Sequence, residues 1–125
     1  MKFARWVFAV AGVYGVLVTF PLYFMEGRIN ADYPPAISHA EYYYGFAGVV
    51  LVWQVLFLFI AKNPAAFRPV IPFCIAEKMS MIPIFAVLFP GGRFPSNWIP
   101  LMLIDLILGA LFWISYRKLR NNQQN

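Results

Sequence analysis

Four polar side chains lie within long apolar stretches of the sequence, and they are the first candidates for chemistry. Glu77 and Lys78 are adjacent in CIAEKMSM, Asp105 lies in LIDLIL and Gln54 lies in LVWQVL. Acids, a base and an amide in apolar surroundings can hold a proton, bind a cation or pair with one another. They are not accompanied by a phosphate loop, a nucleophile elbow or a set of metal-ligating His and Cys residues. We therefore predict no catalytic residue, no cofactor and no metal site.

Membrane-spanning helices must position these residues. The chain has 125 residues, of which 62% are hydrophobic and 12% are charged, and this composition is typical of a membrane protein. Four apolar stretches of about twenty residues each match the roughly 30 Å of hydrocarbon at about 1.5 Å per residue. They are residues 6–25, 43–61, 70–90 and 98–116. We predict an all-α, polytopic, antiparallel four-helix bundle in one domain over residues 1–120, with a disordered polar tail at 121–125.

The length of the third stretch places Glu77 and Lys78 inside the membrane. A span that began only at Met79 would cover about 18 Å by Pro90, whereas a span that begins at Val70 covers about 31 Å. Each charged residue near the centre opposes insertion by about 2.5 to 3.5 kcal/mol. The third helix therefore needs polar partners on its neighbours.

Asp105 in the fourth span and Gln54 in the second lie at a similar depth to the charged pair. Because adjacent helical residues point about 100° apart, Glu77 and Lys78 cannot both face the same neighbour. We expect Lys78 to pair with Asp105, and Glu77 to face Gln54 or a water-filled space. One negative charge then stays uncompensated, so one of the two carboxyl groups is expected to hold a proton part of the time.

Ser80 and Tyr44 are expected to support this cluster. Pro83 cannot donate a hydrogen bond to the carbonyl group of Met79, so the third helix should bend there. Ser80 is close enough in sequence to help satisfy the free carbonyl. Tyr44 belongs to a run of three tyrosines that an aromatic belt at the headgroup level would explain.

The longest polar segment, residues 26–40, is predicted to be an extended loop because it contains two consecutive prolines. Ser38 and Glu41 have the spacing of a capping box. The second helix is therefore expected to begin near His39, with these two side chains satisfying its free amides.

The positions of the basic residues predict the topology. The formal net charge is +5, but the basic residues are dispersed between the apolar stretches, which argues against nucleic acid as a partner. Seven of them would lie on the side that carries both termini, against Arg28 and Arg93 on the other side. The seven are Lys2, Arg5, Lys62, Arg68, Arg117, Lys118 and Arg120. We predict a multi-pass protein of the bacterial inner membrane with both termini cytoplasmic.

Membrane lipids are the expected partners, since the basic side should favour anionic headgroups. Ala11 and Gly15 form a small-xxx-small pair, which allows a homo-oligomer as well as ordinary packing within the bundle.

The segments EYYYGFAGVVLVWQ, AAFRPVIP, AEKMS and LIDLILGALF together resemble a family of small, uncharacterised bacterial four-helix integral membrane proteins over Glu41–Tyr116. The resemblance implies a family pattern made of Trp53, Gln54, Glu77, Lys78 and Asp105, so Trp53 is added as a supporting residue. It implies no activity. The size and the layout of the helices are also similar to those of DoxX-like membrane proteins. Small multidrug resistance transporters share the length and the four helices, but their essential glutamate lies in the first helix. This chain has no acidic residue before Glu26.

Three functions are compatible with the pattern. The first is a module that binds or transports a small proton-coupled or amphipathic ligand at the polar cluster. The second is a structural or accessory membrane subunit, in which the same charges fix the register of the helices. The third, an intramembrane enzyme acting on a lipid or quinone, has the least support because no recognisable catalytic constellation is present.

Overall fold

A computed structural model describes residues 1–124, and this part of the chain is helical, without strands. The helices are α1 (Lys2–Thr19), α2 (Glu26–Asp32), α3 (Ala40–Lys62), α4 (Ile71–Met79), α5 (Met81–Leu88) and α6 (Ile99–Gln124). Short 3₁₀ turns continue α1 over Phe20–Phe24, lead into α4 over Arg68–Val70 and lead into α6 over Ser96–Trp98.

Within residues 1–124, four helical units are long and apolar enough to cross a membrane. They are Lys2–Phe24, Ala40–Lys62, Arg68–Leu88 and Ser96–Gln124, and each overlaps one of the four predicted stretches. The prediction of an all-helical chain with four helices of membrane-spanning length is therefore confirmed.

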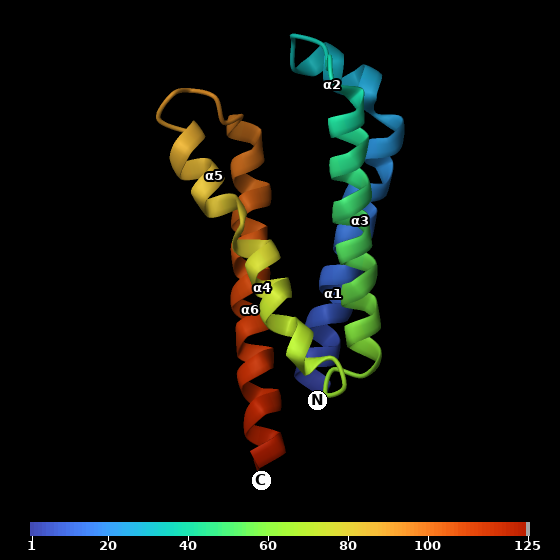
Figure 1. Ribbon diagram of the computed structural model, residues 1–125, viewed down its shortest axis with the longest axis vertical. Helices are drawn as coiled ribbons and strands as arrows, with labels where there is room; N and C mark the ends of the chain where they lie inside the picture. Colours follow the sequence, from blue (N-terminus) through green and yellow to red (C-terminus); the bar gives the residue numbers. More distant parts are fainter. Residues whose placement is uncertain (125) are drawn as a thin grey trace.

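The four units form two antiparallel hairpins (Figure 1). α1 packs along α3, α4 packs along α6, and α1 also contacts α6, so the first and last helices join the two hairpins. Both chain termini and the connection between α3 and α4 lie at one end of the molecule, which we call the terminal end. The opposite end, with α2 and the connection between α5 and α6, is called the far end. The hairpins approach each other toward the terminal end and diverge toward the far end (Figure 1).

α1 lies close to α3 because small residues line its buried face. Ala4, Ala11 and Gly15 are all buried. A Cβ atom added at Gly12 would lie 2.5 Å from Leu58 Cδ2, and one added at Gly15 would overlap the side chain of Gln54. The two helices therefore approach more closely than larger residues would allow.

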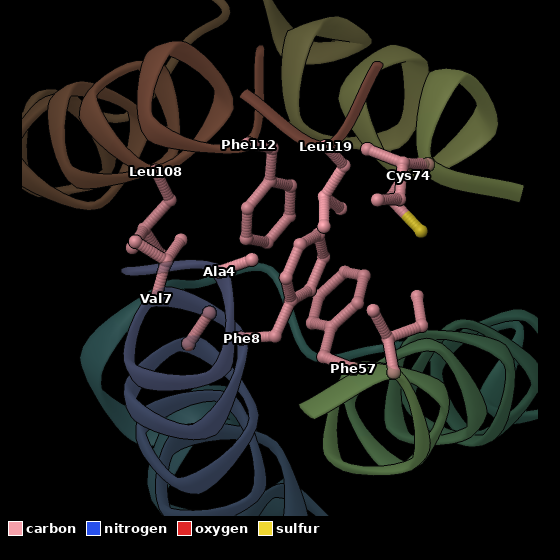
Figure 2. Packing of buried hydrophobic residues seen from close by; sticks show 11 residues of the cluster. Ala4, Val7, Phe8, Phe57, Cys74, Leu108, Phe112 and Leu119 are labelled. Carbon is pink, nitrogen blue, oxygen red and sulfur yellow. The ribbon is translucent and has the colours of Figure 1, made fainter. Parts of the chain in front are cut away.

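Three phenylalanines form the centre of the hydrophobic core (Figure 2). Phe8 of α1 stacks on Phe112 of α6, with ring centroids 4.3 Å apart and an angle of 12° between the planes. Phe57 of α3 meets Phe112 edge to face at 5.0 Å. One aromatic cluster thus holds three of the four long helices together.

The third membrane-length helix is broken at Ser80, as expected from Pro83. α4 ends at Met79 and α5 begins at Met81. Pro83 has no N–H group with which to continue the ladder of hydrogen bonds to Met79. α4 packs against α6, whereas α5, within the described part of the chain, has no buried residue.

The prediction of an extended loop over residues 26–40 is wrong for its first half, which forms α2. Glu26 lies in the first turn, where a negative charge favours a helix, and Arg28 pairs with Asp32 one turn later at 3.7 Å. The capping box is also wrong: His39 is the N-cap of α3, and no side chain caps the helix. Glu41 instead contacts the ring of His39 at 3.2 Å.

The disordered tail predicted at 121–125 is wrong for residues 121–124, where α6 continues to Gln124. Neither Gly nor Pro follows Tyr116, so nothing in the chain interrupts the helical hydrogen bonds. Asn125, the last residue of that predicted tail, lies outside the described residues.

Candidate functional site

Lys78 is buried where α4 crosses α6, with only 3% of its surface exposed. Gly109 makes room for it, since a Cβ atom at that position would lie 3.3 Å from Lys78 Cβ and would overlap the end of the Met79 side chain. The absence of a side chain at Gly109 therefore lets the backbone of α6 approach α4 at the level of the lysine.

The Lys78 ammonium group contacts three other helical residues. Its Nζ atom donates a hydrogen bond to Asp105 Oδ1 of α6 at 3.3 Å. It lies 3.8 Å from Glu77 Oε2 on its own helix. It also lies 5.1 Å from the centre of the Phe57 ring of α3, within the range of a cation–π interaction. Lys78 thus links α4 to both α6 and α3, and the pairing with Asp105 that the sequence suggested is present.

The two acids are less buried than the lysine. The side chain of Lys78 is 4% exposed, whereas those of Glu77 and Asp105 are 19% and 32% exposed. The carboxyl groups therefore form the rim of the cluster and the ammonium group forms its base. Glu77 Oε2 is nonetheless a buried atom, and no group in residues 1–124 donates a hydrogen bond to it.

The charges of the cluster do not balance when all three groups are ionised. Glu77 and Asp105 contribute two negative charges and Lys78 contributes one positive charge, which leaves one negative charge over. A buried acceptor without a donor costs about 1 to 3 kcal/mol, and more when it is charged. Chemically, the cluster can accept one proton or one cationic group that carries a hydrogen-bond donor.

Ser80 does not act as the sequence suggested. Its Oγ donates a hydrogen bond of 2.7 Å to the backbone carbonyl of Glu77, not to that of Met79. This bond lies within the turn where α4 ends, and it holds the backbone next to the charged pair. Ser80 therefore supports the cluster through the backbone of Glu77.

Within residues 1–124, Gln54 makes no hydrogen bond to the charged groups, so of the two expectations for Glu77 the contact with Gln54 is wrong, and the water-filled space stays a prediction. Its side chain is packed against Gly15 of α1, and its Nε2 donates to the Val50 carbonyl at 2.9 Å. Gln54 is 1% exposed, and its Oε1 accepts no hydrogen bond from the described residues. The physical reason is that Gly15 leaves room for the Gln54 side chain at the close contact of α1 with α3, so this side chain packs against α1.

The other two supporting residues also lie outside the cluster. Tyr44 donates a hydrogen bond of 2.8 Å to Glu26 Oε2 and so ties α3 to α2 at the far end. Trp53 is half-buried and packs against the hydrophobic core. Neither residue contacts Lys78 or the two acids through a hydrogen bond or ion pair in the described structure.

The sequence reasoning missed two aromatic residues near the cluster. Phe57, which lies under the Lys78 ammonium group, is three residues after Gln54, about one turn nearer the terminal end of α3. Tyr14 of α1 packs against the core and lies within electrostatic reach of Asp105. Tyr14 could have been identified from the sequence, because its hydroxyl group is a polar group within an otherwise apolar helix.

No group of three or more His, Cys, Asp or Glu side chains within residues 1–124 is placed to hold a metal ion. Comparison of the chain with protein families, with curated proteins and with solved structures found no match.

Proposed function

We propose that the protein binds a proton or a small cationic, amphipathic ligand at the cluster of Glu77, Lys78 and Asp105. The observation that carries the proposal is the buried Glu77 Oε2 atom, which has no hydrogen-bond donor in residues 1–124, beside a cluster with one negative charge in excess. An ammonium or iminium group on the ligand would supply both the missing donor and the missing charge.

The exposure of the three side chains supports a cation over an anion as the ligand. The carboxyl groups of Glu77 and Asp105 form the accessible rim, while the Lys78 ammonium group is shielded by Asp105 and by the ring of Phe57. An approaching ligand therefore meets negative charge first. Its apolar part would lie against the hydrocarbon-facing residues around the break at Ser80, which are largely exposed.

The proposed setting is the bacterial inner membrane, with both termini in the cytoplasm. The resemblance of Glu41–Tyr116 to small bacterial membrane proteins supports the membrane, and the distribution of basic residues supports the orientation. Seven basic residues fall at the terminal end and two, Arg28 and Arg93, at the far end.

A structural or accessory role is the second candidate, and the burial of Lys78 favours it. A lysine whose side chain is only 4% exposed, and which is paired across α4 and α6, fixes the register of these helices whether or not a ligand binds. In that case the excess charge has no use, and replacing Glu77 with a neutral amide should change no binding property.

Binding of ethidium, a cationic aromatic amine that carries hydrogen-bond donors, tests the first candidate. The full chain is placed in nanodiscs of phosphatidylcholine, and fluorescence anisotropy of ethidium is measured against empty nanodiscs. We expect saturable binding, weakened about 30-fold or more by Glu77→Gln, because loss of one partner in a desolvated charge pair costs about 2 kcal/mol or more.

Glu41→Gln is the matched control, since Glu41 is on the exposed start of α3 and its side chain is 68% exposed. We expect this variant to bind ethidium as the unmodified chain does. Binding no stronger than that of empty nanodiscs, or equal binding by the Glu77→Gln variant and the unmodified chain, would refute a cationic ligand at this cluster and favour the accessory role.

A further inference from the structure

α6 is longer than a membrane requires, and its surplus lies at the terminal end. Its 26 residues span about 39 Å, whereas the hydrocarbon layer is about 30 Å thick. The last two turns, which begin at Arg117, therefore lie at the level of the lipid headgroups and beyond.

One face of this surplus carries four side chains that can each donate hydrogen bonds to a phosphate group. Arg117, Arg120, Asn121 and Gln124 follow a spacing of three, four and seven residues, so they lie on one side of the helix. Together they line a shallow hollow of about 290 Å³. Two guanidinium groups one turn apart can each bind a phosphate through paired N–H donors.

Within residues 1–124, no acidic side chain forms an ion pair with this face. Of the five acidic residues in the sequence, Glu26, Asp32 and Glu41 belong to the far end, and Glu77 and Asp105 form the cluster described above. The ion pairs within residues 1–124 all involve those acids, and none reaches the terminal end. The seven basic residues of the terminal end therefore keep their charge available for an external anion.

Aromatic rings hold the basic groups at the depth of the membrane surface. The Arg117 guanidinium lies 5.1 Å from the centre of the Trp113 ring, and the Lys118 ammonium lies 4.3 Å from that of Phe3. Tryptophan at this depth is typical of the boundary between headgroups and hydrocarbon. Trp113 and Ala110 are exposed and lie four and seven residues before Arg117, so they continue the same face into the hydrocarbon.

We propose that this face of α6, made of Arg117, Arg120, Asn121 and Gln124, is a binding site for an anionic phospholipid. The phosphate would lie in the hollow, and an acyl chain would follow Trp113 and Ala110. A lipid fits better than a soluble anion because the polar hollow and the exposed apolar residues form one continuous face. The negative end of the α6 dipole opposes an anion there, but only by a factor of about two to five.

Native mass spectrometry of the full chain in a neutral detergent, with equal amounts of phosphatidylglycerol and phosphatidylcholine, tests this site. We expect retained phosphatidylglycerol on the unmodified chain, and affinity about 30-fold lower in the double variant Arg117→Gln/Arg120→Gln. Each basic residue near an anionic surface contributes a factor of about five. Far-UV circular dichroism checks that the variant keeps its helices.

The double variant Arg28→Gln/Arg93→Gln removes the same charge from the far end and serves as the control. We expect it to retain phosphatidylglycerol as the unmodified chain does. An equal loss in both variants, or equal retention of both lipids by the unmodified chain, would overturn the proposal. Displacement of the lipid by millimolar inorganic phosphate would assign the site to a free anion and would overturn it as well.

Discussion

Replacing Lys78 with Met should destabilise the fold more than neutralising either acid. The methionine has a similar volume, so the main change is the loss of the ammonium group that lies 3.3 Å from Asp105 Oδ1 and 3.8 Å from Glu77 Oε2. The two acids of the cluster would then lack their counter-ion. Glu77→Gln and Asp105→Asn each remove one of two competing negative charges and leave Lys78 with one partner.

The magnitude follows from the distances and the exposure. At an effective dielectric constant of about 20, the two attractions amount to about 5 and about 4 kcal/mol, and desolvation offsets most of each. Removing one partner of a buried pair costs about 3 to 5 kcal/mol. We expect about 3 kcal/mol for Lys78→Met, because the Glu77 and Asp105 side chains are 19% and 32% exposed. For each amide we expect about 1 kcal/mol.

The free energy of unfolding can be measured by titration with sodium dodecyl sulfate in mixed micelles, followed by circular dichroism. Lys62→Met is the matched control: Lys62 is exposed at the end of α3, with its ammonium 5.1 Å from the centre of the Phe59 ring, and its loss should cost less than about 1 kcal/mol. If Lys78→Met proved as stable as Lys62→Met, or more stable than both amide variants, the Lys78 ammonium group would not stabilise the fold through its two ion pairs.

Two further predictions concern packing, with the same unfolding assay as the readout. Gly15→Ala should lower the free energy of unfolding by about 1 to 3 kcal/mol, because the new methyl group would overlap the buried Gln54 side chain. Gly45→Ala in α3 should be neutral or stabilising, because an added Cβ there meets nothing within 4 Å. Equal effects of the two variants would contradict the close contact of α1 with α3. Phe112→Ala should lower the free energy of unfolding by about 3 kcal/mol, because it leaves a cavity beside Phe8. Trp113→Ala removes a half-exposed ring and should lower it less. The reverse order would show that the core lies elsewhere.

The relative levels of residues along neighbouring helices could be predicted from the sequence, because each residue advances a helix by a constant rise. That regularity was enough to place Lys78 and Asp105 at matching levels and to identify them as partners. Pro83 likewise predicted the break near Ser80, since its missing N–H is a local property of the chain.

The direction in which a side chain faces depends on which helices touch, and depth does not determine this. Gln54 lies at a suitable level to meet Glu77, yet the place left open by Gly15 draws α3 against α1, and Gln54 faces that contact. Whether Ser38 caps α3, and whether residues 26–32 form α2, each depend on a free-energy difference of about 1 kcal/mol between two local conformations. Sequence patterns do not resolve differences of this size.

The break at Ser80 divides the third membrane-length helix into a part packed against α6 and a largely uncovered part. α4 carries the buried Lys78, whereas α5 has no buried residue in the described structure. A bilayer that becomes thinner or thicker can therefore be matched by tilting α5 about this joint, at a cost of a fraction of a kcal/mol per ångström. The aromatic core of Phe8, Phe57 and Phe112 is then spared the deformation, and lipid composition would set the angle of α5 without disturbing the ion pair below it.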